Sequence, residues 1–123
     1  MIVKNDLLGY EKYIIYQDTE LFSFSTDSML LADFATINRK TRKIVDFCSG
    51  NFPIPMYLTL RTNANIVGIE IQKASCDLAL MSIKENGLDN QIEVLYYFHI
   101  LSLVEDSQTL ISHLLLYLYL MHS

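Results

Sequence analysis

The chain has 123 residues, of which 51% are hydrophobic and 19% are charged. This length suits one domain rather than two, and the composition excludes a disordered chain. The formal net charge of -5 argues against a surface that is basic throughout, which a large nucleic-acid interface usually requires.

Cellular location is suggested by the cysteines and by the apolar segments. Cys48 and Cys76 have neither the spacing of a CxxC pair nor that of a metal site, and this favours free thiols in a reducing cytoplasm. No apolar run follows a basic start at the N-terminus, so we expect no signal peptide. The longest apolar stretch, residues 110–121, is shorter than the roughly 20 residues that cross a bilayer. We therefore expect a cytoplasmic protein without a membrane span.

The N-terminal region predicts a β-hairpin followed by a helix. Residues 13–16 and 21–24 are β-prone, and the polar residues 17–20 between them predict the turn. Ser25, Thr26 and Asp27 offer capping oxygens for a helix that carries the apolar residues from Met29 to Ala35 and stops before Asn38.

Strands and helices alternate through the middle of the chain. We expect strands at residues 44–47, 66–70 and 92–95, with helices near residues 54–61 and 73–86; Gly87 would end the second helix. This order predicts βαβ units, and hence an α/β fold with about three parallel strands and flanking helices. Residues 96–123 do not continue the pattern.

The loop after the first of these strands carries the clearest candidate site. In doubly wound sheets, ligands bind at the carboxyl ends of the strands. Here Asp46 closes the first strand, Gly50 gives the following loop its conformational freedom, and Glu70 ends the second strand. Gly50 and Glu70 are about 20 residues apart, as a phosphate-side turn and a ribose-binding carboxylate are in one βαβ unit. This spacing alone leaves a nucleotide-type site and an ordinary α/β domain equally open.

Four segments together resemble a known family. These are residues 6–10, residues 22–32, the loop 46–51 with Ile54-Pro55, and residues 66–72. In this order and spacing they are similar to the tRNA1(Val) (adenine-37 N6)-methyltransferases over residues 4–95. The resemblance implies the N-terminal half of a Rossmann-like methyltransferase fold and S-adenosyl-L-methionine as cofactor. It also implies tRNA as the partner and methylation of adenine N6 as the reaction.

The resemblance also assigns roles to individual residues. Glu70 would bind the ribose hydroxyls, Ile71 and Gln72 would flank the adenine, and Thr26 and Asp27 would close the pocket from the N-terminal side. The methionine part would be lined by Asp46, Cys48, Ser49, Gly50 and Asn51. No metal site, and no nucleophilic role for Cys48, is expected.

The chain departs from the family pattern at three places. Phe52 replaces a second glycine; we expect its ring to occupy cofactor space and the following Pro53 to favour an extended backbone there. Residues 96–99 lack the carboxylate expected after the third strand, and the catalytic Asn-Pro-Pro-Tyr motif, which holds the flipped base, is absent. We therefore divide the chain into a cofactor-binding part, residues 1–95, and a divergent or out-of-frame apolar tail, residues 96–123, and expect little or no catalysis.

Two other functions stay open. The chain could be a non-catalytic binding or regulatory module that pairs with a protein partner through an open sheet edge. It could also be a remnant without selected activity. The basic cluster of Arg39, Lys40, Arg42 and Lys43 could contact RNA phosphates, although a solvated loop is the more frequent role of such a run.

Overall fold

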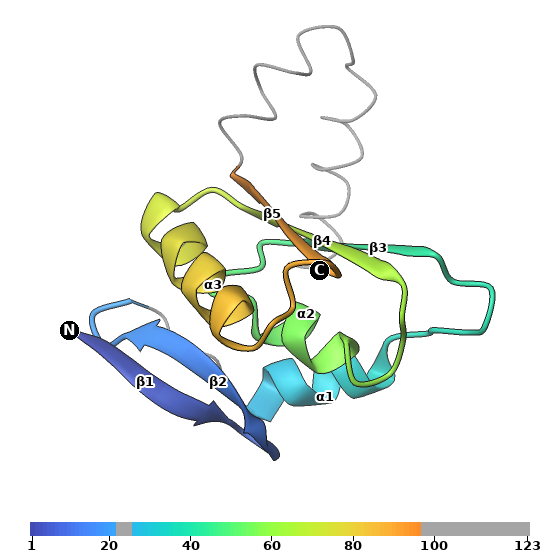
Figure 1. Ribbon diagram of the computed structural model, residues 1–123, viewed down its shortest axis with the longest axis horizontal. Helices are drawn as coiled ribbons and strands as arrows, with labels where there is room; N and C mark the ends of the chain where they lie inside the picture. Colours follow the sequence, from blue (N-terminus) through green and yellow to red (C-terminus); the bar gives the residue numbers. More distant parts are fainter. Residues whose placement is uncertain (22–25, 97–123) are drawn as a thin grey trace, which may run out of the picture.

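The computed structural model describes residues 1–21 and 26–96. A two-stranded hairpin precedes a three-stranded sheet with helices (Figure 1). The elements in chain order are β1 (Ile2–Leu7), β2 (Tyr10–Asp18), α1 (Thr26–Phe34), β3 (Lys43–Phe47), α2 (Pro53–Leu58), β4 (Asn65–Glu70), α3 (Lys73–Glu85) and β5 (Ile92–Tyr96).

The parallel sheet confirms the predicted α/β fold. Its strand order is β3-β4-β5, with Val45 opposite Val67 and Gly68 opposite Val94. The sheet thus grows in one direction, and right-handed crossovers in such a sheet place α2 and α3 on the same face. Both helices lie on one side of the sheet in Figure 1. The central strand β4 is buried from Ile66 to Glu70, as its apolar sequence predicts.

The expected turn of the hairpin is wrong in its position, and most of its expected second strand lies outside the described residues. Residues 13–16 do form a strand, but β2 extends through Asp18, so the expected turn at 17–20 begins inside it. Its partner is β1, which lies upstream and runs antiparallel, with Ile2 opposite Asp18. The tight connection contains Gly9, whose φ of 80° a larger residue would rarely adopt. Residues 22–24 lie outside the described residues.

Polar side chains from α3 attach the hairpin to the rest of the fold. Asn86, just after α3, accepts a hydrogen bond from the Ile14 amide at 2.8 Å and donates to the Ile14 carbonyl at 2.6 Å. The Tyr16 amide donates to Ser82 Oγ at 2.8 Å. These bonds satisfy backbone groups of β2 as a third strand would. The Asn86 side chain therefore completes the outer edge of the hairpin.

The core lies between the hairpin, the helices and the sheet. Leu7 and Ile15 from the hairpin and Ala79 from α3 belong to one cluster with Met56 and Ile66, and each is fully buried. α1 also packs on α2, and the Arg61 guanidinium donates to the Ala32 carbonyl.

Membrane and metal features are absent from the part of the chain that the structure describes. No helix there is long and apolar enough to cross a membrane. No group of three or more candidate metal ligands gathers there either. Residues 97–123, which make up most of the proposed tail, lie outside the described residues.

Candidate functional site

The sheet brings the two predicted carboxylates to one edge. Asp46 is the fourth residue of β3 and pairs with Gly68, while Glu70 is the last residue of β4. Both side chains are largely buried, with 9% exposure for Asp46 and 7% for Glu70. The loop of residues 48–52 connects β3 to α2 beside them. The carboxyl ends of two neighbouring strands thus bring the two carboxylates together, as the order of strands and helices predicts.

The loop backbone is left-handed at three positions. Cys48 has a φ of 57°, Gly50 of 59° and Phe52 of 71°. The Ser49 amide donates to the Ile69 carbonyl of β4 at 3.0 Å, and the Phe52 amide donates to the Ser49 carbonyl at 2.9 Å. A Cβ built on Gly50 would meet no atom within 4 Å, so the loop is open at this residue. A ligand can approach the backbone there.

Glu70 fixes the loop and the chain after β4 together. Its Oε2 accepts a hydrogen bond from the Gly50 amide at 2.6 Å. Its Oε1 accepts from the amides of Ile71 and Gln72, each at 3.0 Å. A carboxylate offers about four acceptor positions, and these three bonds leave one for a further donor. The remaining acceptor position suits a hydroxyl donor such as that of a ribose.

Asp46 is held by its neighbour in the loop. Ser49 Oγ lies 2.7 Å from Asp46 Oδ2 and 2.7 Å from the Asp46 carbonyl oxygen. Burial raises the pKa of Asp46 to about 6; the Ser49 hydrogen bond opposes the shift, and the charge of Glu70 adds to it. The site therefore contains a carboxyl group that changes charge close to neutral pH.

Asn51 has a structural contact that the sequence did not indicate. Its Nδ2 donates to the Tyr16 carbonyl of β2 at 3.0 Å, and the residue is buried. The amide side chain thus ties the loop to the hairpin. Any contact with a ligand would come from other atoms of Asn51.

The expected conformation of Phe52 is wrong. Its φ of 71° and ψ of 38° are left-handed rather than extended, so this phenylalanine does occupy a backbone region that glycine favours. Its ring is fully buried, and it belongs to the same core cluster as Met56 and Ile66. It packs against Gly68 of β4. The ring therefore fills the core instead of the open side of the loop.

The remaining predicted site residues lie around this edge or on α1. Ile71 is 57% exposed directly after β4, which leaves an apolar surface free, and Gln72 accepts a hydrogen bond from Ser75. Thr26 and Asp27 form the first turn of α1, a separate element, and their part in the site stays a prediction.

The Cys48 thiol shows no activation. Partial burial, followed by the charges of Glu70 and Asp46, raises its pKa. A thiol with a raised pKa is mostly protonated at neutral pH, and the thiolate is the nucleophile. The residues near Cys48 thus disfavour the thiolate that nucleophilic catalysis would need.

Comparisons with known proteins agree with this fold. TYW2 of P. horikoshii, solved with MeSAdo, has a TM-score of 0.62 and 14% identity, with 77% of this chain and 35% of that chain covered. A tRNA (uracil-54, C5)-methyltransferase of Pyrococcus abyssi, solved with S-adenosyl-L-homocysteine, has a TM-score of 0.57 and 17% identity over 76% of this chain and 23% of that chain. TrmK of M. capricolum, solved with S-adenosyl-homocysteine, has a TM-score of 0.51 and 18% identity over 61% of this chain and 32% of that chain.

These similarities establish the fold. The chain has the Rossmann-like α/β fold of S-adenosylmethionine-dependent methyltransferases, and it spans about a quarter to a third of the length of these three structures. No protein-family model matches the chain, and no curated protein matches it.

Proposed function

We propose that this chain binds S-adenosylmethionine at the carboxyl edge of β3 and β4, as the cofactor-binding part of a tRNA methyltransferase. The observation that carries the proposal is the pairing of Glu70 with the Gly50 amide across the two strand ends. A carboxylate at the end of the second strand and a glycine loop after the first are the parts that bind a nucleoside ligand in such sheets.

The ends of β3 and β4 would bind different parts of the cofactor. Glu70 would accept a hydrogen bond from a ribose hydroxyl through its remaining acceptor position. The exposed side chain of Ile71, with Gln72 beside it, would lie against the adenine. The methionine part would lie along the open side of Gly50, with Asp46 nearby.

The proposed substrate is adenine N6 in tRNA. Its support is the sequence resemblance together with the fold shared with tRNA methyltransferases. Bound S-adenosylmethionine would supply the methyl group, and this chain's residues would hold and orient it. The catalytic Asn-Pro-Pro-Tyr motif is absent from the sequence. We therefore propose weak or no methyl transfer by this chain, with cofactor binding in a cytoplasmic protein as the retained function.

Calorimetric titration with S-adenosylmethionine tests the proposal. The wild-type chain should bind it, and Glu70→Gln should weaken binding about tenfold, because a hydrogen bond to a charged group is worth about 1.5 kcal/mol or more. Glu93→Gln, on the exposed side of β5, removes the same charge and should leave binding unchanged. Absence of binding by the wild-type chain, or equal loss in both variants, would contradict the proposal. Incubation with bulk tRNA and labelled cofactor measures any methyl transfer.

A non-catalytic module is the second candidate. Among the described strands, β3 and β5 each have a single neighbour in the sheet, and Val45 of β3 is 42% exposed. An unpaired strand edge is a template for pairing with another chain. This candidate would be favoured if the chain binds no S-adenosylmethionine and forms a defined complex with another protein through β3.

A further inference from the structure

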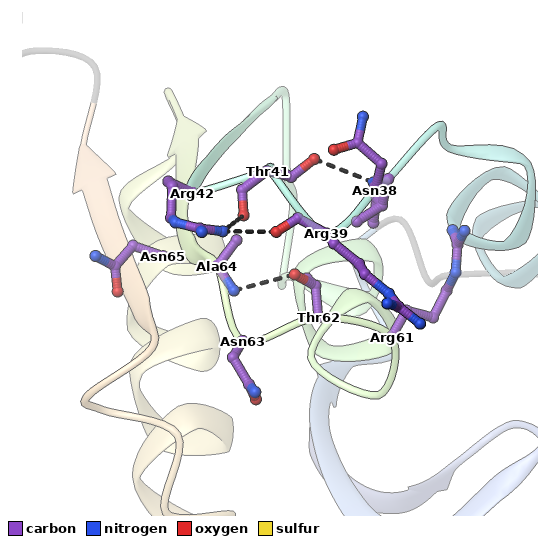
Figure 2. A pocket seen from close by; sticks show the side chains of 10 residues that line it. Asn38, Arg39, Thr41, Arg42, Arg61, Thr62, Asn63, Ala64 and Asn65 are labelled. Atoms are coloured by element: carbon purple, nitrogen blue, oxygen red, sulfur yellow. Dashed lines mark hydrogen bonds between the residues drawn. The ribbon is translucent and has the colours of Figure 1, made fainter.

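A basic hollow lies at the amino ends of β3 and β4, opposite the carboxyl ends that carry the proposed cofactor site. It has a volume of about 710 Å³ and forms where the segment before β3 meets the segment before β4. Its lining includes three arginines, Arg39, Arg42 and Arg61, and three asparagines, Asn38, Asn63 and Asn65. Figure 2 shows Arg42 on the side of the sheet, with Arg39 and Arg61 extending to the other side of the hollow.

The hollow is distinct from the proposed cofactor site. Lys43 and Asn65 are the first paired residues of β3 and β4, so the hollow adjoins the amino ends of these strands. The cofactor residues lie at the carboxyl ends. Five residues of strand separate the two edges, which corresponds to roughly 16 Å.

The arginine side chains are accessible, and two of them are held in place. All three arginines are exposed. Arg42 Nη1 donates to the carbonyls of Arg39 at 2.8 Å and Thr41 at 3.3 Å, and one guanidinium nitrogen of Arg61 donates to the Ala32 carbonyl. A guanidinium carries five N–H donors, so most of the donors stay available for a ligand.

The charge of the hollow contrasts with that of the whole chain. The formal net charge is -5, yet no carboxylate occurs among the described residues that line the hollow. Arginine forks match the oxygen geometry of phosphate, and asparagine amides add neutral donors. This set of side chains suits an anion with several oxygens.

We propose that this hollow, lined by Arg39, Arg42 and Arg61, binds backbone phosphates of RNA. The inference rests on the proposed function and adds an RNA contact at the edge away from the cofactor. An RNA strand presents a phosphate at every nucleotide. One RNA molecule can therefore contact both the hollow and the carboxyl ends of β3 and β4. The contacts would position the RNA without reading its sequence.

Binding of bulk tRNA to the full chain at several salt concentrations tests the inference. The double variant Arg39→Gln/Arg42→Gln should weaken binding about tenfold and lower the slope of log affinity against log salt by about one to two. The control Lys12→Gln/Lys84→Gln removes two exposed charges from β2 and α3 and should change both quantities little. Equal effects of the two double variants would overturn the inference.

Two further measurements keep the result unambiguous. If the double variant does not fold, Arg39→Gln alone replaces it. Arg39 is an exposed loop residue, and Arg42 contacts its backbone carbonyl, which the substitution keeps. This variant should weaken tRNA binding about threefold. Inorganic phosphate at millimolar concentration should compete poorly with tRNA; strong competition would indicate a site for the free anion and overturn the RNA assignment.

Calorimetry with S-adenosylmethionine separates this inference from the proposed function. The arginine variants should bind the cofactor like the wild-type chain. Cofactor binding with tRNA binding that does not depend on the arginines would contradict the inference alone. Arginine-dependent tRNA binding without cofactor binding would support the inference and contradict the proposed function.

Discussion

The ring of Phe52 lies where a side chain on Gly68 would have to be. A Cβ built on Gly68 would come within 2.2 Å of Cε2 of Phe52. Gly68 is in the middle of the central strand, where glycine contributes no side chain to packing, and the ring from the loop after β3 fills this space. This buried contact therefore couples the loop to the sheet, in addition to the hydrogen bonds that Ser49 and Gly50 donate to β4.

This contact predicts that Gly68→Ala destabilises the fold. The added methyl group must displace the ring or the strand, and overpacking of this kind costs about 2 to 3 kcal/mol. Urea denaturation followed by circular dichroism measures the loss. Gly50→Ala is the matched control: its Cβ meets open space, so it should cost only the left-handed strain of about 1 kcal/mol. A loss for Gly68→Ala no larger than for Gly50→Ala would contradict the packing.

Phe52→Gly tests the role of the ring from the other side. The change relieves the left-handed backbone at a φ of 71° but empties a fully buried ring site. Truncation of a buried phenylalanine costs about 3 to 5 kcal/mol, which exceeds the relieved strain of about 1 to 2 kcal/mol. We expect a less stable protein with no gain in affinity for S-adenosylmethionine. Tighter cofactor binding by a variant as stable as the wild-type chain would show that the ring obstructs the cofactor.

The sequence predicts the sheet and the closeness of Gly50 to Glu70, but not the conformation of the loop between β3 and α2. The alternation of apolar strands and helices, with Gly87 at the end of α3, is a local signal, and the structure confirms the three parallel strands. The spacing of Gly50 and Glu70 likewise places both at one edge. Glycine at position 68 of the buried strand is the one signal that could have suggested a ring packed against it.

The errors came from contacts between distant segments. Pro53 does favour an extended Phe52, but burial of the ring against β4 outweighs this local preference. The sequence does not predict β1 as the partner of β2, because β1 is mostly exposed and its residues 4–6 are polar, which weakens its strand signal. The role of Asn86 at the edge of β2 depends on a partner 72 residues away and has no sequence signature.

Asn86→Ala should loosen the hairpin. The change leaves the amide and carbonyl of Ile14 without their partners, and each unsatisfied group costs about 1 to 3 kcal/mol. We expect a loss of about 2 to 3 kcal/mol in the free energy of unfolding, measured by urea denaturation, and faster hydrogen exchange of the Ile14 amide. Asn90→Ala, an exposed residue near the same helix end, should have little effect. An Ile14 amide that exchanges as slowly in Asn86→Ala as in the wild-type chain would contradict this docking.

Asp46 should make stability depend on pH. Its pKa is about 6 in the fold against 3.8 for an ordinary aspartate, so folding favours the protonated form. The stabilising contribution is present below about pH 4 and is lost as pH rises through about 6. The wild-type chain should lose about 2 to 3 kcal/mol from this group between pH 4 and pH 7.5.

Asp46→Asn isolates this contribution, because its side chain is uncharged throughout the range. The variant should be more stable than the wild-type chain at pH 7.5, and the difference should vanish near pH 4. Urea denaturation at several pH values measures the two curves, and groups common to both proteins cancel in the difference. Asp89→Asn, at an exposed position, is the control for removing one carboxylate from the chain. A parallel curve for Asp46→Asn would show that Asp46 has an ordinary pKa.

The same titration should control cofactor binding, if Asp46 lies beside the positively charged methionine part of S-adenosylmethionine. The ionised carboxylate attracts that charge and the protonated form does not, so affinity should rise by about tenfold as pH increases from 5 to 7. Calorimetry across this range should give a midpoint below 6, because a bound cation lowers the pKa of the carboxyl group that it faces. In Asp46→Asn the affinity should be weaker and nearly independent of pH. A variant that keeps the wild-type pH profile would place the titrating group elsewhere and remove Asp46 from the cofactor site.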